Sequence, residues 1–259
     1  MRQKHKTWRW ILFVLSLIVF AAMIFTGVPI LKYLVEGKQE ERSLIAVRES
    51  YYDKKTSEED KVDALVETES EIYAEADYMG QYESLLEINE DMVGWITIPN
   101  TNIDYPVVQT VDNVYYLGRN ILNRYSDRGA IFLDYRNMGN GTDKNTVIYG
   151  HNMYDGSMFA RLYKLKDADY YTTHKIITLN LKGTYSEWEI FAVYITNDDP
   201  VRTSFSSDYD FEQYLKIIDS KKMYETDAEA QVSDQILTLS TCTNVEHDGR
   251  LVVHARKRK

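Results

Sequence analysis

An uncharged stretch near the N-terminus places the strongest constraint on how this chain can fold. From Trp10 to Leu31 there are 22 residues without a charge, and as a helix they span about 33 Å at about 1.5 Å per residue. This length matches the hydrocarbon core of a bilayer. A buried core helix and a cleavable signal peptide are the alternatives, but their apolar segments are usually shorter. We therefore predict a single transmembrane helix over residues 10–31.

The charges around this stretch predict its orientation. Residues 1–35 carry a net charge of +5, residues 36–91 carry −12, and residues 92–259 carry −3. Basic residues flank the stretch on both sides, but the N-terminal group is denser and includes the terminal amine. The positive-inside rule therefore favours a cytoplasmic tail at residues 1–9 and a large domain outside. Pro29 falls near the predicted end of the helix, where a lost backbone hydrogen bond matters least.

The overall composition excludes several classes of protein. A net charge of −10, with 40 acids and 30 bases, makes nucleic acid an unexpected partner, because phosphate binding relies on a clustered basic surface. One cysteine in 259 residues excludes a disulfide scaffold. Twenty-one tyrosines and only four prolines favour β-structure.

The acidic segment at residues 32–88 is predicted to be a helical linker. It contains no proline, and its apolar residues recur at loosely helical intervals. We expect a solvated spacer followed by a helix packed on the next domain; an acidic surface that docks a partner is the alternative. The side chains expected to face that domain are Tyr82, Leu85, Leu86 and Ile88.

Residues 89–259 are predicted to form a mainly β domain, because the apolar period changes there from helical to alternating. A short helix is expected at residues 159–165 and a longer one at 211–223, before the strand that contains the cysteine. Many short strands with few helices favour a closed barrel, which has no exposed sheet edges. The eight predicted strands cover residues 94–99, 105–110, 129–134, 146–149, 176–181, 188–196, 236–241 and 251–255.

The lone cysteine, Cys242, is the first candidate for chemistry. Alternation along its strand assigns it to the polar face, with Thr238 and Ser240. In an exported chain a single cysteine cannot form an internal disulfide. It is therefore an inert buried residue, an intermolecular bridge or a reactive thiol, and the residues alone leave these three interpretations open.

A reactive thiol needs a base or a cation nearby, and two residues qualify. His151 follows Gly150, which we expect to turn the backbone and hold the imidazole at the rim of the barrel. Arg250 opens the last strand, so a hairpin would bring it beside Cys242, where it could bind an oxyanion. No metal-ligand spacing or phosphate loop is present, so no metal or cofactor is expected. The histidines that compete with His151 are His5, His174, His247 and His254.

These residues resemble the motifs of the sortase family. Thr238-Leu-Ser-Thr-Cys242 is similar to the T-L-x-T-C signature, Tyr149-Gly-His151-Asn152 to the histidine motif, and Arg250-Leu-Val-Val-His254 to the final arginine strand. Their order and spacing agree too, and the resemblance covers about residues 80–257. Class B sortases in particular are indicated by Gly94-Trp-Ile, Tyr105-Pro-Val-Val-Gln109, Phe132-Leu-Asp-Tyr-Arg-Asn137, Ser157-Met-Phe159 and the long helix before the cysteine strand.

The resemblance implies a membrane-anchored cysteine transpeptidase on the outer face of a Gram-positive bacterium, built on an eight-stranded barrel. Cys242 would attack the carbonyl of a threonine in a C-terminal sorting motif and form a thioester. His151 would protonate the leaving amine and later deprotonate the incoming one, while Arg250 would hold the substrate carbonyl. The implied partners are a surface protein with a sorting motif and an amine of a peptidoglycan precursor, a cross-bridge or a pilin lysine.

Three further residues are candidates for substrate binding. Asn113 falls where class B relatives have an active-site asparagine, although an asparagine in a turn is the alternative; Leu117 ends the same segment. Ser240 shares a strand face with Cys242 and would contact substrate or bond to a neighbouring strand. The loop at residues 198–202 falls where the family shapes its specificity, but it matches family patterns too little to carry over a motif preference.

Two other functions remain open on these grounds. A membrane-anchored cysteine peptidase would hydrolyse its thioester whether or not an amine is present. A non-catalytic tethered scaffold would keep its function without Cys242, although the presence of His151 and Arg250 argues against it.

Overall fold

The computed structural model describes residues 2–62, 70–197, 201–242 and 249–258. The chain divides into two compact units, Met1–Ile45 and Ala46–Lys259. The loop that contains His247 and the first residues of the predicted specificity loop, 198–200, lie outside the described residues.

Helix α1 (Arg2–Val62) contains the predicted apolar stretch. Within the described residues, its segment Trp10–Tyr52 is the one helix long and apolar enough to cross a membrane, with a mean hydropathy of 2.8 in its most apolar window. The prediction that the helix ends near Pro29 was wrong, because α1 continues through this proline. A proline removes only one backbone hydrogen bond, and a helix of 61 residues keeps the others on both sides.

Eight strands form a closed barrel, as predicted, in the order β1-β2-β3-β4-β7-β8-β6-β5. The pairs β2/β3 and β4/β7 are parallel, and the other pairs are antiparallel. Closure leaves no unpaired edge for another chain to join. The strands are β1 (Met92–Thr97), β2 (Asp104–Val108), β3 (Ile131–Leu133), β4 (Asn145–His151), β5 (Ile176–Leu181), β6 (Thr184–Thr196), β7 (Ile236–Cys242) and β8 (Arg250–Lys257).

Short helices connect several of these strands. The predicted short helix is a 3-10 helix, η2 (Phe159–Lys166), and the predicted long helix is α4 (Asp208–Lys221). Ser207 caps α4, because its side chain accepts a hydrogen bond from the backbone N–H of Asp210. The remaining helices are α2 (Ser70–Leu86), η1 (Tyr115–Leu117) and α3 (Ala168–Thr173).

The C-terminal part of α1 packs on the barrel within the second unit. Tyr51 stacks on Trp95 of β1, with 4.4 Å between ring centroids and an interplanar angle of 11°. Arg48 forms an ion pair with Asp104 at 2.7 Å, and Asp104 also accepts a hydrogen bond from the indole N–H of Trp95 at 2.6 Å. The default interpretation of the acidic segment, a helix packed on the following domain, describes this part of α1.

Helix α2 packs on the same side of the domain, with one difference from the prediction. Leu85 is fully buried, but Leu86 is exposed, and Gln81 and Ser84 are buried in its place. Residues three and four apart share a helix face, so Gln81, Ser84 and Leu85 form one stripe that excludes Leu86. Tyr82 is half-buried, and so is Ile88, which follows the end of α2.

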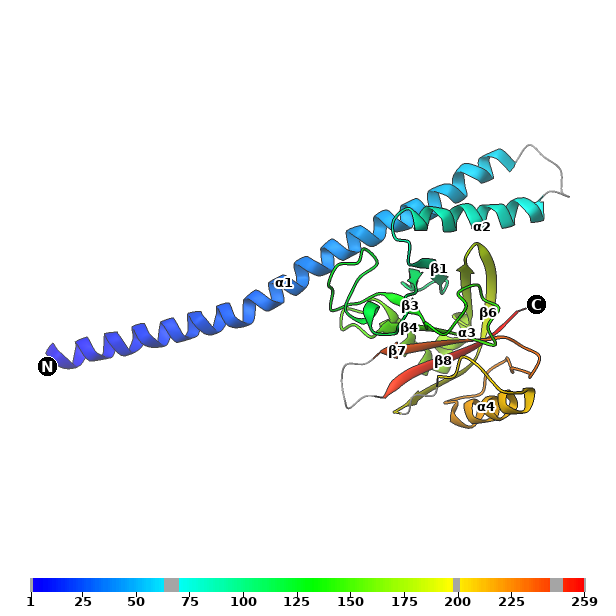
Figure 1. Ribbon diagram of the computed structural model, residues 1–259. Coiled ribbons are helices and arrows are strands. Elements are labelled where there is room, and N and C mark those ends of the chain that lie inside the picture. The colour runs from blue at the N-terminus through cyan, green and yellow to red at the C-terminus, as the bar shows by residue number, and fades with distance from the viewer. Residues whose placement is uncertain (1, 63–69, 198–200, 243–248, 259) are drawn as a thin grey trace. The chain divides into compact units, whose positions relative to one another are not determined.

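Both faces of β7 are covered by protein. Leu237 and Leu239 are fully buried, and so are Thr238 and Ser240 on the opposite face. Ile236, in line with Thr238 and Ser240, belongs to the apolar cluster that α4 forms on the barrel. The polar face of β7 is therefore a buried one, and α4 lies near this part of the barrel in Figure 1.

Candidate active site

The strand register brings His151 and Cys242 together. In the parallel pair β4/β7 the two residues are direct partners at the ends of their strands, and adjacent strands lie about 4.8 Å apart. On the other side of β7, Ser240 is opposite Val252 of β8, and the backbone N–H of Leu251 donates to the Thr241 hydroxyl at 3.0 Å.

The antiparallel register of β7 with β8 ends at the pair of Ser240 and Val252, two residues before Arg250, and the strand partner of Arg250 on its other side is Thr196 of β6. Arg250 begins β8 and is half-buried. His151 and Cys242 are therefore paired at the ends of β4 and β7, and Arg250 begins the next strand, β8; these three strands are neighbours in the barrel (Figure 1).

The His151 imidazole is buried and has a defined partner. Its Nε2 lies 2.8 Å from the backbone oxygen of Leu117. Because a carbonyl oxygen only accepts hydrogen bonds, we assign a proton to Nε2. Nδ1 is then the ring nitrogen that can exchange a proton with a reacting group.

Gly129 allows the loop before β3 to close on this imidazole. Its φ is +59°, and a Cβ there would lie 2.6 Å from the Tyr116 oxygen and 2.9 Å from Cδ2 of His151. Only glycine combines this backbone conformation with such a close approach.

Gly150 does not act as predicted. It lies inside β4 rather than at a turn, and His151 is still part of the strand. A Cβ at position 150 would lie 2.5 Å from Ile131 and 2.8 Å from the ring of Phe159. The glycine is required by close packing on this face of β4, not by a bend before the histidine.

The structure gives two of the predicted substrate-binding residues partners within the protein. The Asn113 side chain donates from Nδ2 to Oδ2 of Asp134 at 3.0 Å and accepts at Oδ1 from the backbone N–H of Tyr135 at 3.0 Å. Leu117 is half-buried and offers its carbonyl to His151. The two bonds of Asn113 fix the orientation of its amide and leave one N–H of Nδ2 and one lone pair of Oδ1 for a further partner.

Ser240 is enclosed on all sides. Its exposed fraction is 0%, and its hydroxyl has no hydrogen-bond partner among the described residues. An unsatisfied buried polar group costs about 1–3 kcal/mol. The predicted contact with substrate remains a prediction, and it requires a rearrangement that exposes Ser240.

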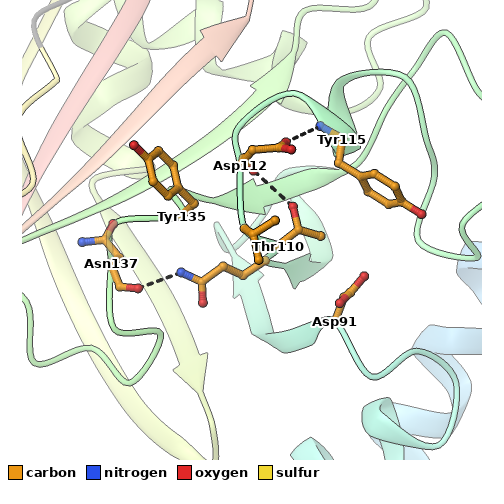
Figure 2. Close-up of a pocket in the computed structure, with 8 residues that line it drawn as sticks. Asp91, Thr110, Asp112, Tyr115, Tyr135 and Asn137 are labelled. Carbon is orange, nitrogen blue, oxygen red and sulfur yellow. Dashed lines mark hydrogen bonds between the residues drawn. The ribbon is translucent and has the colours of Figure 1, made fainter.

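A pocket of about 550 Å³ is lined by residues around the end of β2 and the loop after β3 (Figure 2). The sequence did not point to it, because its lining comes from three separate segments. Hydrogen bonds from the backbone N–H groups of Tyr115 and Val114 hold the pKa of Asp112 below its usual value. None of the three predicted catalytic residues belongs to its described lining, which consists of Asp91, Gln109, Thr110, Val111, Asp112, Tyr115, Tyr135 and Asn137.

Arg202, in the predicted specificity loop, is held by an ion pair. Its Nη2 lies 2.6 Å from Oδ2 of Asp210 at the start of α4, and the guanidinium keeps the pKa of that carboxyl well below its usual value. Its Cζ also lies 4.7 Å from the centroid of the Phe205 ring.

In the described residues, no group of three or more His, Cys, Asp or Glu side chains is arranged to hold a metal ion.

Two of the competing histidines have structural positions. His174 is the C-cap of α3 and stacks on Tyr170, with 3.8 Å between ring centroids. His254 is fully buried, with Nδ1 2.9 Å from the Thr238 hydroxyl and Nε2 2.9 Å from the Tyr194 hydroxyl. The Thr238 hydroxyl donates to Asn145, so it accepts from Nδ1–H of a neutral His254.

Burial lowers the pKa of His254 to about 3, and this predicts a pH-dependent stability. Between about pH 6.5 and 3 the unfolded chain binds a proton at this residue that the folded chain does not. The free energy of unfolding should therefore fall as the pH falls through this range, by up to about 1.4 kcal/mol per pH unit. Above about pH 6.5 the stabilisation from neutral His254 is fully present. Denaturant unfolding of wild type and His254→Gln between pH 5 and 7 measures this difference in slope.

The matched control is His174→Gln, which removes a partly exposed imidazole and should keep the wild-type slope. A His254→Gln chain whose stability depends on pH as wild type does would show that His254 is not the residue responsible.

Comparisons with known proteins agree with this geometry. The family model described as "Sortase domain" matches residues 96–258. A curated relative, sortase B of Listeria monocytogenes, is 38% identical over 246 residues, which is 93% of this chain and 94% of that protein. Sortase B of Staphylococcus aureus is 37% identical over 180 residues, 68% of this chain and 74% of that protein.

Solved structures give the same result. A Staphylococcus aureus sortase B–substrate complex has a TM-score of 0.74 and 32% identity, covering 87% of this chain and 99% of that one. A Bacillus anthracis sortase B in complex with AAEK1 has a TM-score of 0.66 and 42% identity, covering 70% of this chain and 85% of that one. With the family model, the closed barrel and these class B relatives in agreement, the chain belongs to the sortase family of cysteine transpeptidases, in class B.

Proposed function

We propose that this protein is a membrane-anchored transpeptidase that cleaves a C-terminal sorting motif after threonine and transfers the cleaved protein to an amine of the cell wall. The observation that supports this most directly is the pairing of His151 with Cys242 at the ends of β4 and β7, with Arg250 at the start of the adjacent strand β8. A nucleophile, a proton carrier and a cation side by side are the parts that acyl transfer requires.

In the first step the thiolate of Cys242 attacks the threonine carbonyl carbon. A cysteine of ordinary pKa, about 8.5, is only a few per cent thiolate at neutral pH, and the neighbouring cation of Arg250 favours this form. Arg250 also stabilises the negative charge on the tetrahedral oxygen. The C–N bond then breaks, His151 gives a proton to the leaving amine, and a thioester remains on Cys242.

In the second step an amine replaces the thiol. The incoming amine attacks the thioester carbonyl, His151 takes a proton from it, and the C–S bond breaks to return the Cys242 thiolate. The product holds a new amide bond. The acceptor amine belongs to a peptidoglycan precursor, a cross-bridge or a pilin lysine.

Substrate binding is proposed for Asn113, Leu117 and Ser240. The carbonyl oxygen of Leu117 lies 2.8 Å from Nε2 of the His151 imidazole. A substrate peptide bound along the segment from Asn113 to Leu117 would therefore pass beside His151. Support for a substrate site in this fold comes also from the Staphylococcus aureus relative, which was solved as a sortase B–substrate complex.

The proposed location is the outer face of the cell membrane. Residues 1–9 form the cytoplasmic tail, residues 10–31 the membrane span, residues 32–88 the linker and residues 89–259 the catalytic domain. The apolar segment of α1 supports the span, and the denser N-terminal positive charge supports the orientation.

The test uses the full-length chain in detergent and a panel of NPQTN-like and LPXTG-like peptides. Mass spectrometry should detect wild type carrying the peptide fragment that ends in threonine, together with the released C-terminal fragment. Addition of a short glycine peptide should convert the thioester into a product with a new amide bond.

The outcomes separate the three functions. A thioester that yields only the free acid, with or without the glycine peptide, would identify a peptidase. Absence of a thioester with every peptide would favour the tethered scaffold.

A further inference from the structure

Asp134 is a buried carboxylate with an unusually complete set of donors. It follows β3 and its exposed fraction is 0%. Oδ1 accepts from the backbone N–H and from Nε of Arg136, both at 2.9 Å. Oδ2 accepts from Nη2 of Arg136 at 2.7 Å, from Nδ2 of Asn113 at 3.0 Å and from the Tyr149 hydroxyl at 3.0 Å.

One group of these contacts leads to His151 through a loop. Asn113, which Asp134 holds, begins the segment that continues through η1 to Leu117. The Leu117 carbonyl is the partner of Nε2 of His151 at 2.8 Å. The position of this carbonyl therefore depends on where the loop is fixed.

A second contact leads to His151 through β4. Tyr149 precedes His151 by two residues, so the two side chains lie on the same face of the strand. In the ladder with β7, Tyr149 is the partner of Ser240, and His151 is the partner of Cys242. Asp134 thus holds both the strand that carries the imidazole and the loop that orients it.

We propose that Asp134 is a positioning residue for the transpeptidase reaction: it fixes the loop from Asn113 to Leu117 against β4, so that the Leu117 carbonyl keeps the proton of His151 on Nε2 and directs Nδ1 to the reacting groups. The inference rests on the function proposed above. In this role Asp134 does not touch the substrate. It determines the tautomer and the orientation of His151, which transfers the proton.

The charge of Asp134 is essential to this arrangement. Burial alone raises the pKa of a carboxyl, but the hydrogen bonds from Arg136 and Asn113 outweigh it and hold the pKa of Asp134 below its usual value. An asparagine at this position would accept at one oxygen only and would point an N–H₂ group at donors. Depending on the orientation of the amide, either the two Arg136 donors at Oδ1 or the three donors at Oδ2, from Arg136, Asn113 and Tyr149, would then face an N–H₂ group.

The test compares wild type with Asp134→Asn in the full-length chain. We expect kcat for thioester formation to fall about 10- to 100-fold, because a displacement of about 1 Å in a catalytic group has effects of this size. The pH–rate profile should also differ from that of wild type, because the group that transfers the proton is displaced. By NMR of histidine-labelled protein, the Nε2–H signal of His151 should be observed in wild type and be lost or shifted in the variant.

The matched control is Glu189→Gln. Glu189 is also a mostly buried carboxylate, with a side chain 16% exposed, and it pairs with Arg256 at 2.8 Å between β6 and β8. This variant should lose stability without changing kcat, the pH profile or the His151 signal. Tyr149→Phe removes a single donor to Asp134. It should change kcat, the pH profile and the His151 signal in the same direction as Asp134→Asn, but by a smaller amount. This variant keeps the test valid if Asp134→Asn does not fold.

The outcomes distinguish this inference from the proposed function. If wild type forms no thioester, the proposed function fails, and the NMR signal still decides whether Asp134 orients His151. If wild type is active but Asp134→Asn and Tyr149→Phe match Glu189→Gln in kcat, pH profile and His151 signal, Asp134 is only a structural residue and the inference is overturned.

Discussion

Cys242→Ala is expected to form no thioester with any sorting peptide and to lower kcat/KM for transpeptidation by at least about 10⁵-fold, the scale seen when a covalent nucleophile is removed. Alanine has no atom that can bond to the substrate carbonyl, so His151 and Arg250 are left without a nucleophile to assist. The measurement is intact-protein mass spectrometry of the full-length variant, combined with a product assay in the presence of a glycine peptide.

The control for this variant is its stability. Cys242 is the last residue of β7, and its substitution removes little volume, so thermal unfolding should be close to that of wild type. A Cys242→Ala chain that still couples peptide to amine would refute the assignment of the nucleophile.

His151→Ala is expected to lower kcat by about 10³- to 10⁴-fold, at the upper end of what general acid–base catalysis contributes. Without the imidazole, the leaving amine departs unprotonated and the incoming amine keeps its proton. Single-turnover kinetics should show that thioester formation and aminolysis both slow down. The KM for the sorting peptide should change much less than kcat, because the imidazole acts mainly on the transition state.

A small exogenous base provides the control for His151→Ala. The substitution removes a buried ring beside Gly129 and leaves a cavity, so added imidazole should restore part of the activity. A variant that retains wild-type rates for both steps would show that another group carries the proton.

The strands were predictable because their signal is local. Alternation of apolar and polar residues needs only a few neighbouring residues, and all eight predicted strands are present, together with α4. The errors arose where the signal depends on packing. Leu86 has the same chemistry as Leu85 and differs only in which way it faces, and the packing role of Gly150 depends on Ile131 and Phe159, which are contributed by other segments.

The candidate site was predicted in part. The residue types of Cys242, His151 and Arg250 and their order point to acyl transfer, and the β4/β7 register makes two of them direct neighbours. No local pattern indicated the role proposed for Asp134, because an aspartate after a strand is common in turns. Its five hydrogen bonds bring together segments that are distant in the chain.

The sequence by itself determined which segments are apolar, helical or extended, and which side chains can act as nucleophile, base and cation, because these properties belong to single residues and their near neighbours. Only the tertiary structure decided the order of the strands around the barrel, the tautomer assigned to His151 and the burial of Ser240. These depend on contacts between residues far apart in the chain, whose pairing is fixed by the packing of the whole barrel and not by any local pattern.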